Sequence, residues 1–139
     1  MELAKKVVDK MMSGDAFSQW LGIEVLKIDE GFCKLQMKVR DEMTTGFTIA
    51  HGGVSYSLAD SCLAFAANSY GIQAVSVETS ISHTKKVKSG DMLTASSKEI
   101  NKSSKTALYY ITITNQNKKE IAHFKGTVFR TEKEWFPSK

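Results

Sequence analysis

The feature that most constrains the fold of this chain is a long apolar helix near its middle. Residues 54–69 consist mainly of alanine, leucine and small polar residues, with a single acid, Asp60, among them. A helix that is apolar on most of its sides is stable only when other elements cover those sides. The simplest architecture is therefore an α+β arrangement in which an antiparallel sheet curves around this helix.

Hydrophobic periodicity predicts the remaining elements. An apolar residue recurs every four positions from Leu3 to Met11, which predicts an N-terminal helix over about residues 2–13. A short aromatic hook follows at residues 17–21, and the central helix is expected over about residues 52–70. Alternation of apolar and polar residues predicts six strands, the first two joined as a hairpin, at residues 23–28, 32–39, 74–83, 92–100, 106–114 and 121–131.

Composition argues against several classes of function. The 139 residues suit one domain spanning residues 1–139, and their 42% hydrophobic content and net charge of +4 are those of an ordinary globular chain. No stretch is long and apolar enough to predict a membrane span. Most lysines are scattered singly, and no strand interleaves aromatic with basic residues. We therefore expect neither nucleic acid nor a membrane as a partner.

The cysteines indicate the cellular compartment. Cys33 and Cys62 stand far apart and lack the spacing of metal ligands, which predicts neither a zinc site nor a disulfide framework. A chain of this kind is typical of a reducing environment. We therefore expect the protein to reside in the cytoplasm.

Asp60 is the first candidate for chemistry. No Lys or Arg occurs between Arg40 and Lys85, so no cation close in sequence compensates the carboxylate. An uncompensated buried charge destabilises a fold, whereas perturbed carboxylates cluster at functional sites. The alternative is an acid that faces solvent from one edge of the helix or bonds a neighbouring backbone group.

The glycine pair at the start of the helix is the second candidate. Gly52 and Gly53 follow His51 and leave backbone N–H groups unshielded at the positive end of the helix dipole. Such groups suit an oxyanion, because acyl transfer places negative charge on the carbonyl oxygen of its tetrahedral intermediate. Gly52 is the expected donor. Most glycine pairs merely mark turns, so the downstream acid adds weight to this interpretation.

Helix geometry separates these two groups within one chain. The eight residues from Gly52 to Asp60 rise by about 12 Å. A donor and an attacking group that act on the same carbonyl should lie only about 5 to 6 Å apart. Two antiparallel copies of the helix across a two-fold axis would instead pair Gly52 of one chain with Asp60 of the other, which predicts a dimer with two equal sites.

Several motifs then carry a family resemblance. They are His51-Gly52-Gly53, Ser57-Leu58-Ala59-Asp60, Asn68-Ser69-Tyr70-Gly71, Val75-Ser76-Val77 and Ser89-Gly90-Asp91. Over roughly residues 15–131 the chain resembles the hotdog-fold acyl-CoA thioesterases, in particular the PaaI-like branch of phenylacetic acid degradation. The resemblance implies a hotdog fold, dimers often paired into tetramers, and hydrolysis of an acyl- or aryl-acyl-CoA thioester without a metal or bound cofactor.

The resemblance also implies roles for individual residues. Asp60 would be the nucleophile or general base, Gly52 the oxyanion donor, and Ser76 a group that holds the attacking water. His51 would steady the turn or polarise the thioester, and a purely structural histidine is an equal alternative. Thr45 stands six residues before His51, where relatives often carry Asn, so its part in the site is open.

The substrate would meet a basic cluster and an apolar surface. Lysines are point charges that suit the phosphates of coenzyme A, although a lysine cluster also suits a solvated loop. The lysines are Lys85, Lys86 and Lys88. Beside Gly53, the acyl group would lie against residues for which core packing is the alternative, namely Phe17, Trp20, Tyr56 and Leu63.

Two other functions fit the same fold. An acyl-thioester dehydratase or hydratase would place a catalytic histidine opposite an acid, for which His83 and His123 are the available residues. A non-catalytic acyl-CoA-binding module would bind the ligand without turnover. The acyl group, the choice between dimer and tetramer, and the choice between nucleophile and base for Asp60 are left open by the sequence.

Overall fold

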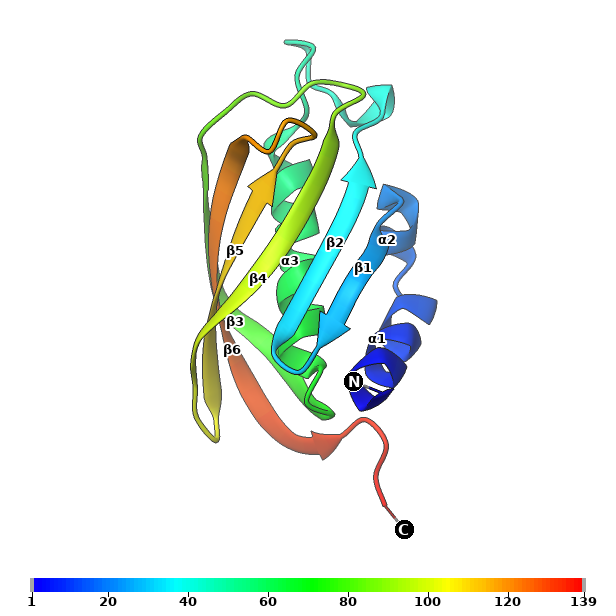
Figure 1. Cartoon of the computed structure of the whole chain (residues 1–139), viewed down its shortest axis with the longest axis vertical. Helices are drawn as coiled ribbons and strands as arrows, with labels where there is room; N and C mark the ends of the chain where they lie inside the picture. Colours follow the sequence, from blue (N-terminus) through cyan, green and yellow to red (C-terminus); the bar gives the residue numbers. More distant parts are fainter. Residues whose placement is uncertain (1, 139) are drawn as a thin grey trace.

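An open antiparallel sheet curves around one long helix in the computed structural model, which describes residues 2–138 (Figure 1). Its strand order is β1-β2-β4-β5-β6-β3. The helices are α1 (Glu2–Ser13), α2 (Ala16–Leu21) and α3 (Gly52–Asn68), with a 3-10 turn at Asp41–Met43. The strands are β1 (Glu24–Asp29), β2 (Phe32–Lys38), β3 (Ile72–His83), β4 (Met92–Lys102), β5 (Thr106–Thr114) and β6 (Glu120–Glu134). The expected α+β architecture is confirmed.

Helix α3 supplies the centre of the hydrophobic core. It contacts all six strands, and Leu58, Ala59 and Cys62 on its inner face are fully buried. Small residues such as Ala59 let the sheet approach the helix closely, while full burial of a leucine contributes about 2 kcal/mol. Burial on the concave face leaves only a narrow strip of α3 accessible, and the candidate site residues lie along it.

The end of α3 differs slightly from the predicted one. The helix stops at Asn68 rather than near residue 70, because the Asn68 side chain binds the chain that leaves the helix. Its Nδ2 donates to the Ala74 carbonyl at 3.1 Å, and its Oδ1 accepts from the Ala74 N–H at 2.9 Å and from Trp135 Nε1 at 2.8 Å. These bonds fix the start of β3 and the end of β6 beside the helix.

The aromatic hook proves to be the short helix α2. Asp15 caps it, since its Oδ1 accepts from the Ser18 N–H at 2.9 Å, and Gly22 ends it with a left-handed φ of 74°. Phe17 and Trp20 stack with ring centroids 6.3 Å apart, and both rings are largely exposed. The two rings therefore form an exposed aromatic surface, while Leu21 of the same hook is buried in the core.

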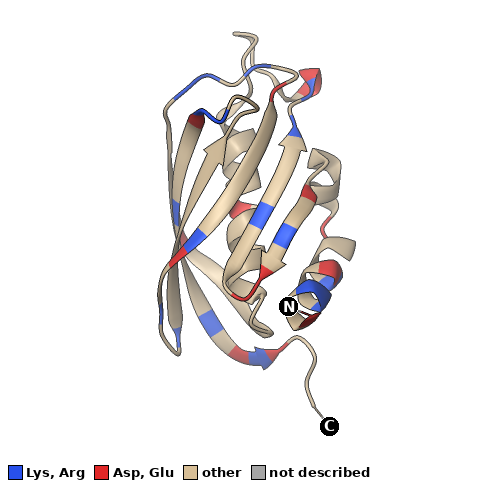
Figure 2. Ribbon diagram, in the orientation of Figure 1, with Lys and Arg blue, Asp and Glu red and all other residues tan. Residues whose placement is uncertain are grey.

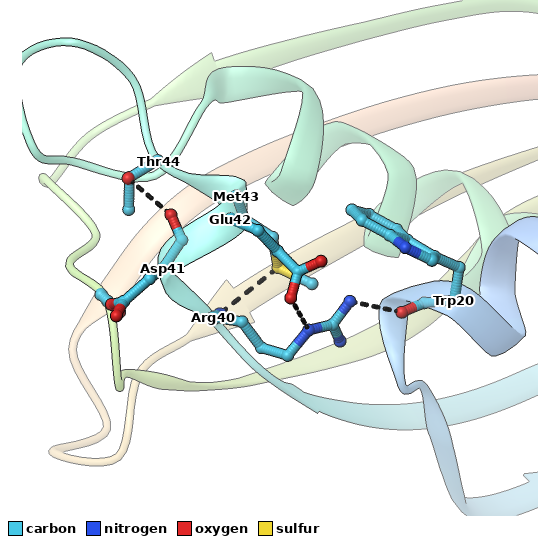
Figure 3. Close-up of polar contacts among 7 residues, drawn as sticks. Trp20, Arg40, Asp41, Glu42, Met43 and Thr44 are labelled. Carbon is cyan, nitrogen blue, oxygen red and sulfur yellow. Dashed lines mark hydrogen bonds and ion pairs between the residues drawn. The ribbon is translucent and has the colours of Figure 1, made fainter.

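Arg40 ties α2 to the loop that precedes α3 (Figure 3). Its Nη2 donates to the Trp20 carbonyl at 2.6 Å, its Nε contacts the Glu42 carboxylate at 3.2 Å, and its guanidinium lies 4.9 Å from the Trp20 ring centre. A planar guanidinium can make such contacts simultaneously. The loop that leads to His51 is thereby held against α2.

One edge of the sheet is long and apolar. Strand β3 pairs with β6 on one side only, and Val75 and Val77 are 56% and 62% exposed. Long exposed edges with apolar side chains invite pairing with another chain. None of the helices within residues 2–138 is long and apolar enough to cross a membrane.

The hairpin turn between β1 and β2 offers a stability test. Gly31 has a φ of +71°, and an added Cβ would lie 2.5 Å from the Tyr70 hydroxyl and 2.8 Å from Glu99 Oε1. The Tyr70 hydroxyl donates to that Glu99 oxygen, so neither group can move freely. We expect Gly31→Ala to lower the free energy of unfolding by about 2 to 3 kcal/mol, measured by urea denaturation.

Gly90→Ala is the matched control for this substitution. Gly90 has a φ of +90°, but no atom lies within 4 Å of the added Cβ. Only the left-handed strain remains there, about 1 to 2 kcal/mol. Equal losses for the two variants would show that the Tyr70 and Glu99 contacts do not matter.

Candidate functional site

The first turn of α3 presents one unbonded backbone donor. His51 caps the helix, and its Nδ1 accepts from the Gly53 N–H at 2.9 Å. The Val54 N–H donates to the His51 carbonyl at 2.9 Å. Within the described chain the Gly52 N–H has no acceptor, so of these three amides it is the one that can bind an oxyanion.

Gly52 opens onto a pocket of about 410 Å³ that also contains basic residues. Its lining includes Ser55, His83, Lys85 and Lys86. The His83 ring is close to the glycine, because a Cβ added at Gly52 would lie 3.2 Å from His83 Cε1. Figure 2 shows the basic stretch in the loop after β3, at the end of the molecule where α3 begins. The structure thus brings two predicted lysines to the predicted oxyanion donor.

Asp60 lies further along α3, and its carboxylate has no compensating cation within the described chain, as the sequence predicts. It is half-buried, and its carboxylate has no hydrogen bond or ion pair to any residue within 2–138. Desolvation by burial raises the pKa of Asp60 above its ordinary value of 3.8, and the negative charge of Asp15 raises it further. A carboxylate with a raised pKa is a stronger base than an exposed aspartate.

Asp60 lines a pocket of about 390 Å³ between α3, α1 and the β3 edge. Ser76, on β3, lines the same pocket, so the predicted base and the predicted water-holding hydroxyl are brought together. Leu63 also lines it. The remaining lining residues are Met11, Ala64, Asn68, Gln73, Ala74, Val75, Val128 and Trp135.

Within one chain the pockets of Gly52 and Asp60 are separate. They have no lining residue in common. Both residues belong to the same continuous helix, whose rise between them is about 12 Å. A single chain therefore does not bring its own Gly52 and Asp60 to one carbonyl carbon.

A third pocket, of about 340 Å³, joins the helix start to the aromatic hook. Its lining includes His51, Gly53 and Ser57 from the start of α3 and the aromatic residues Phe17 and Trp20 from the hook. The other lining residues are Leu21, Glu42, Met43, Thr44 and Val54. Gly53 and the two aromatic residues that the sequence suggested for the acyl group thus share one surface.

Three other predicted residues lie outside these pockets. Thr45 Oγ1 accepts from the Phe47 N–H at 3.1 Å and has no contact with Asp60. The Tyr56 hydroxyl is hydrogen-bonded to Thr79, and its ring packs edge-on against Phe124 with centroids 5.5 Å apart. Lys88 lies in the loop after β3, where its N–H donates to Asp91 at 2.9 Å. In one chain these residues have structural contacts.

Two residues of the site region were not assigned to hydrolysis by the sequence analysis. His83 lies against Gly52, whereas the sequence offered it only for dehydration. Asp15 acts on Asp60 electrostatically from the start of α2. The Asp-x-x-Ser pattern at Asp15 signals a helix cap but gives no sign of a neighbour 45 positions away. Within residues 2–138 no cluster of His, Cys, Asp and Glu could hold a metal ion.

Comparisons with known proteins place this geometry in a family. The family model of the thioesterase superfamily matches residues 47–122, which include α3 and both candidate site residues. The acyl-coenzyme A thioesterase PaaI of Escherichia coli is 38% identical over 120 residues, covering 86% of each chain. A protein of Archaeoglobus fulgidus, described in general terms as an esterase, is 36% identical over 137 residues, or 99% of this chain and 89% of that protein.

Solved structures agree with the sequence matches. The E. coli PaaI structure superposes with a TM-score of 0.93 at 34% identity, covering 96% of both chains. A thioesterase protein of Streptococcus pneumoniae, solved with coenzyme A, superposes with a TM-score of 0.84 at 26% identity, covering 90% of this chain and 98% of that one. The predicted hotdog fold and the PaaI-like resemblance are confirmed, and the chain belongs to the thioesterase superfamily.

Proposed function

We propose that this protein is an acyl-CoA thioesterase whose active site forms between two copies of the chain. Asp60 of one protomer would serve as base or nucleophile, and the Gly52 N–H of its partner would hold the oxyanion. The observation that carries this proposal is that one helix bears an uncompensated, half-buried carboxylate and, about two turns away, an unbonded N–H.

A two-fold axis can bring these groups together. Antiparallel pairing of two α3 helices sets the start of one helix beside the middle of the other, so that each Gly52 meets an Asp60. The unpaired β3 edge, with Val75 and Val77 exposed, offers the surface for such pairing. Ser76 belongs to the same chain as Asp60 and lines the same pocket, so each shared site would contain both residues.

The chemistry needs few groups. The Asp60 carboxylate either removes a proton from water as the water attacks the thioester carbonyl, or attacks that carbon itself and forms an anhydride that water then hydrolyses. Ser76 would bond the water, and Gly52 would bind the developing oxyanion. The thiolate leaves without acid assistance, because a thiol ionises at about pH 8.5.

The pocket at Gly52 suits the nucleotide end of coenzyme A. Lys85 and Lys86 line it, and their ammonium groups would pair with phosphates. We expect the double variant Lys85→Ala/Lys86→Ala to raise KM for an acyl-CoA roughly fivefold, with kcat little changed. Initial rates of thiol release at fixed ionic strength would give both constants.

Two controls isolate the phosphate contact. The variant Lys34→Ala/Lys38→Ala removes the same charge from β2 and should leave KM unchanged. An acyl-N-acetylcysteamine thioester lacks phosphates, so its KM should be the same for wild type and the Lys85/Lys86 variant. An equal rise in KM for both thioesters would rule out a phosphate role for these lysines.

Thiol release from a panel of aryl and straight-chain acyl-CoAs tests the function itself. Turnover of at least one member, with free acid as the product, is the expected result. A new double bond without thiol release would identify a dehydratase, for which His83 beside Gly52 is the available histidine. Tight binding of acyl-CoA without turnover, unaffected by Asp60→Asn, would identify a binding module.

As part of this proposal we place the protein in the cytoplasm, where the free, buried thiols of Cys33 and Cys62 remain reduced.

A further inference from the structure

A chain of side-chain hydrogen bonds joins the start of α2 to α3 next to Asp60. Ser18 Oγ donates to Asp15 Oδ2 at 2.6 Å, and Ser18 Oγ and Ser61 Oγ lie 2.8 Å apart. Ser18 is 1% exposed, so the link is shielded from water. Ser61 is the residue that follows Asp60 on the helix.

The direction of this chain follows from its protons. A serine hydroxyl carries one proton, and Ser18 gives its proton to Asp15. Ser61 must therefore donate to Ser18. Both hydroxyls point their protons toward Asp15, and the Ser18 N–H donates to the same carboxylate at 2.9 Å. Two donors, the Ser18 hydroxyl and the Ser18 N–H, therefore fix the Asp15 carboxylate in place, and Ser61 orients the first of them.

Within residues 2–138 of the same protomer, Asp15 is the one charged side chain that acts on the pKa of Asp60. The pocket of Asp60 is lined from α1, β3 and β6 by residues that do not ionise, among them Met11, Gln73 and Val128. Several charged side chains of these elements make contacts elsewhere: Lys5 with Asp9, Lys6 and Lys10 with the Phe136 ring, Glu78 with Lys125, and Arg130 with the Ser103 carbonyl. Helix α2 has no ionisable residue.

We propose that Asp15 is a positioning residue for the hydrolysis: its carboxylate, fixed through Ser18 and linked through Ser61 to the turn of α3 that carries Asp60, repels negative charge on Asp60 and contributes to the lower pH limit of activity. This inference rests on the proposed function, in which Asp60 must be ionised to act. Repulsion keeps the proton on Asp60 to a higher pH, and the carboxylate that forms is a stronger base. Asp15 thus lowers activity at acidic pH and makes the Asp60 carboxylate a stronger base near neutral pH.

The test is the pH profile of kcat/KM for Asp15→Asn. Asparagine caps a helix as well as aspartate does, so α2 is retained while the charge is lost. We expect the acidic limb to move to lower pH and the plateau of kcat to fall modestly, because the pKa of Asp60 drops and the base becomes weaker. The carboxyl ¹³C resonance of Asp60, followed by NMR, should show its titration midpoint moving the same way.

Further variants separate charge from structure. Asp15→Ser also keeps a capping oxygen without the charge and should shift the acidic limb by the same amount. It replaces Asp15→Asn as the test if that variant does not fold. Asp9→Asn removes one negative charge from the exposed pair on α1 and should move neither the profile nor the NMR midpoint. Superimposable profiles and midpoints for wild type, Asp15→Asn and Asp15→Ser would overturn the role of Asp15.

The same experiments distinguish this inference from the proposed function. If Asp60→Asn retains full thioesterase activity, the proposed function of Asp60 fails, whatever Asp15 does. If Asp60→Asn is inactive and the Asp15 variants match wild type in both readouts, only the role of Asp15 fails.

Discussion

Replacing Asp60 by asparagine is expected to lower kcat/KM for acyl-CoA hydrolysis by about a hundredfold or more. Removal of a principal base or nucleophile lowers kcat/KM by this order, because no other group of the described chain takes over proton transfer. Asparagine has nearly the same size and fills the same half-buried place. Thiol release under single-substrate conditions measures the loss, and Asp60→Ala should give a similar one.

A stability measurement shows that this loss is chemical. The pKa of Asp60 is raised above 3.8 in the folded chain, first by burial and then by Asp15, so the folded state holds the proton more tightly than the unfolded state. The stability that this protonation contributes is present below pH 3.8 and is lost as the pH rises through the folded value. At neutral pH, Asp60→Asn should therefore be as stable as wild type or more stable. A less stable, inactive variant would point to damage to the fold instead.

Removing the N–H of Gly52 is expected to lower kcat by about a hundredfold, the usual effect of losing an oxyanion donor. Gly52→Pro removes this N–H with little change to the helix, because Gly52 is the first helical residue, where proline is favoured. The preceding His51 has φ −61° and ψ 138°, which proline accepts in its neighbour. Steady-state kinetics of thiol release would measure the effect.

Gly52→Ala is the matched control. It adds the same Cβ, which meets the His83 ring at 3.2 Å, but it keeps the N–H. The exposed imidazole can shift by the few tenths of an ångström required. We expect alanine to retain most of the activity that proline loses. Equal losses in both variants would mean that space beside His83, rather than the donor, is what matters.

Mixing two inactive proteins tests whether the site is shared. In a mixed dimer of Asp60→Asn and Gly52→Pro, one site carries both substitutions and the other carries neither. Random exchange of subunits would restore about a quarter of the wild-type activity. If each chain used its own Gly52 and Asp60, no activity would return, and the proposed two-chain site would be wrong.

Much of the fold follows from periodicity, because burial on one face leaves a regular imprint on the sequence. The six strands and α3 appear at the expected places, and their ends differ by a few residues where local contacts decide. Asn68 ends α3 earlier than predicted because its side chain binds Ala74. The extended end of β6, which reaches Glu134, has no apolar alternation that predicts it.

The site was predictable only where its residues share one element. Gly52 and Asp60 lie on a single helix, so their spacing could be measured from the sequence. The effect of Asp15 could not be predicted, because it depends on how the turn between α1 and α2 folds back onto α3 through Ser18 and Ser61. The same holds for His83, which reaches Gly52 from the end of β3.

The open edge of β3 has a consequence for how enzymatic competence arises. Under the proposed arrangement, a newly synthesised chain is inactive until it binds a second copy, because each active site takes residues from both chains. The onset of turnover after refolding should then follow second-order kinetics in protein concentration. Dilution below the dimer dissociation constant would abolish the activity. The cellular concentration of the protein would therefore determine whether the enzyme is active.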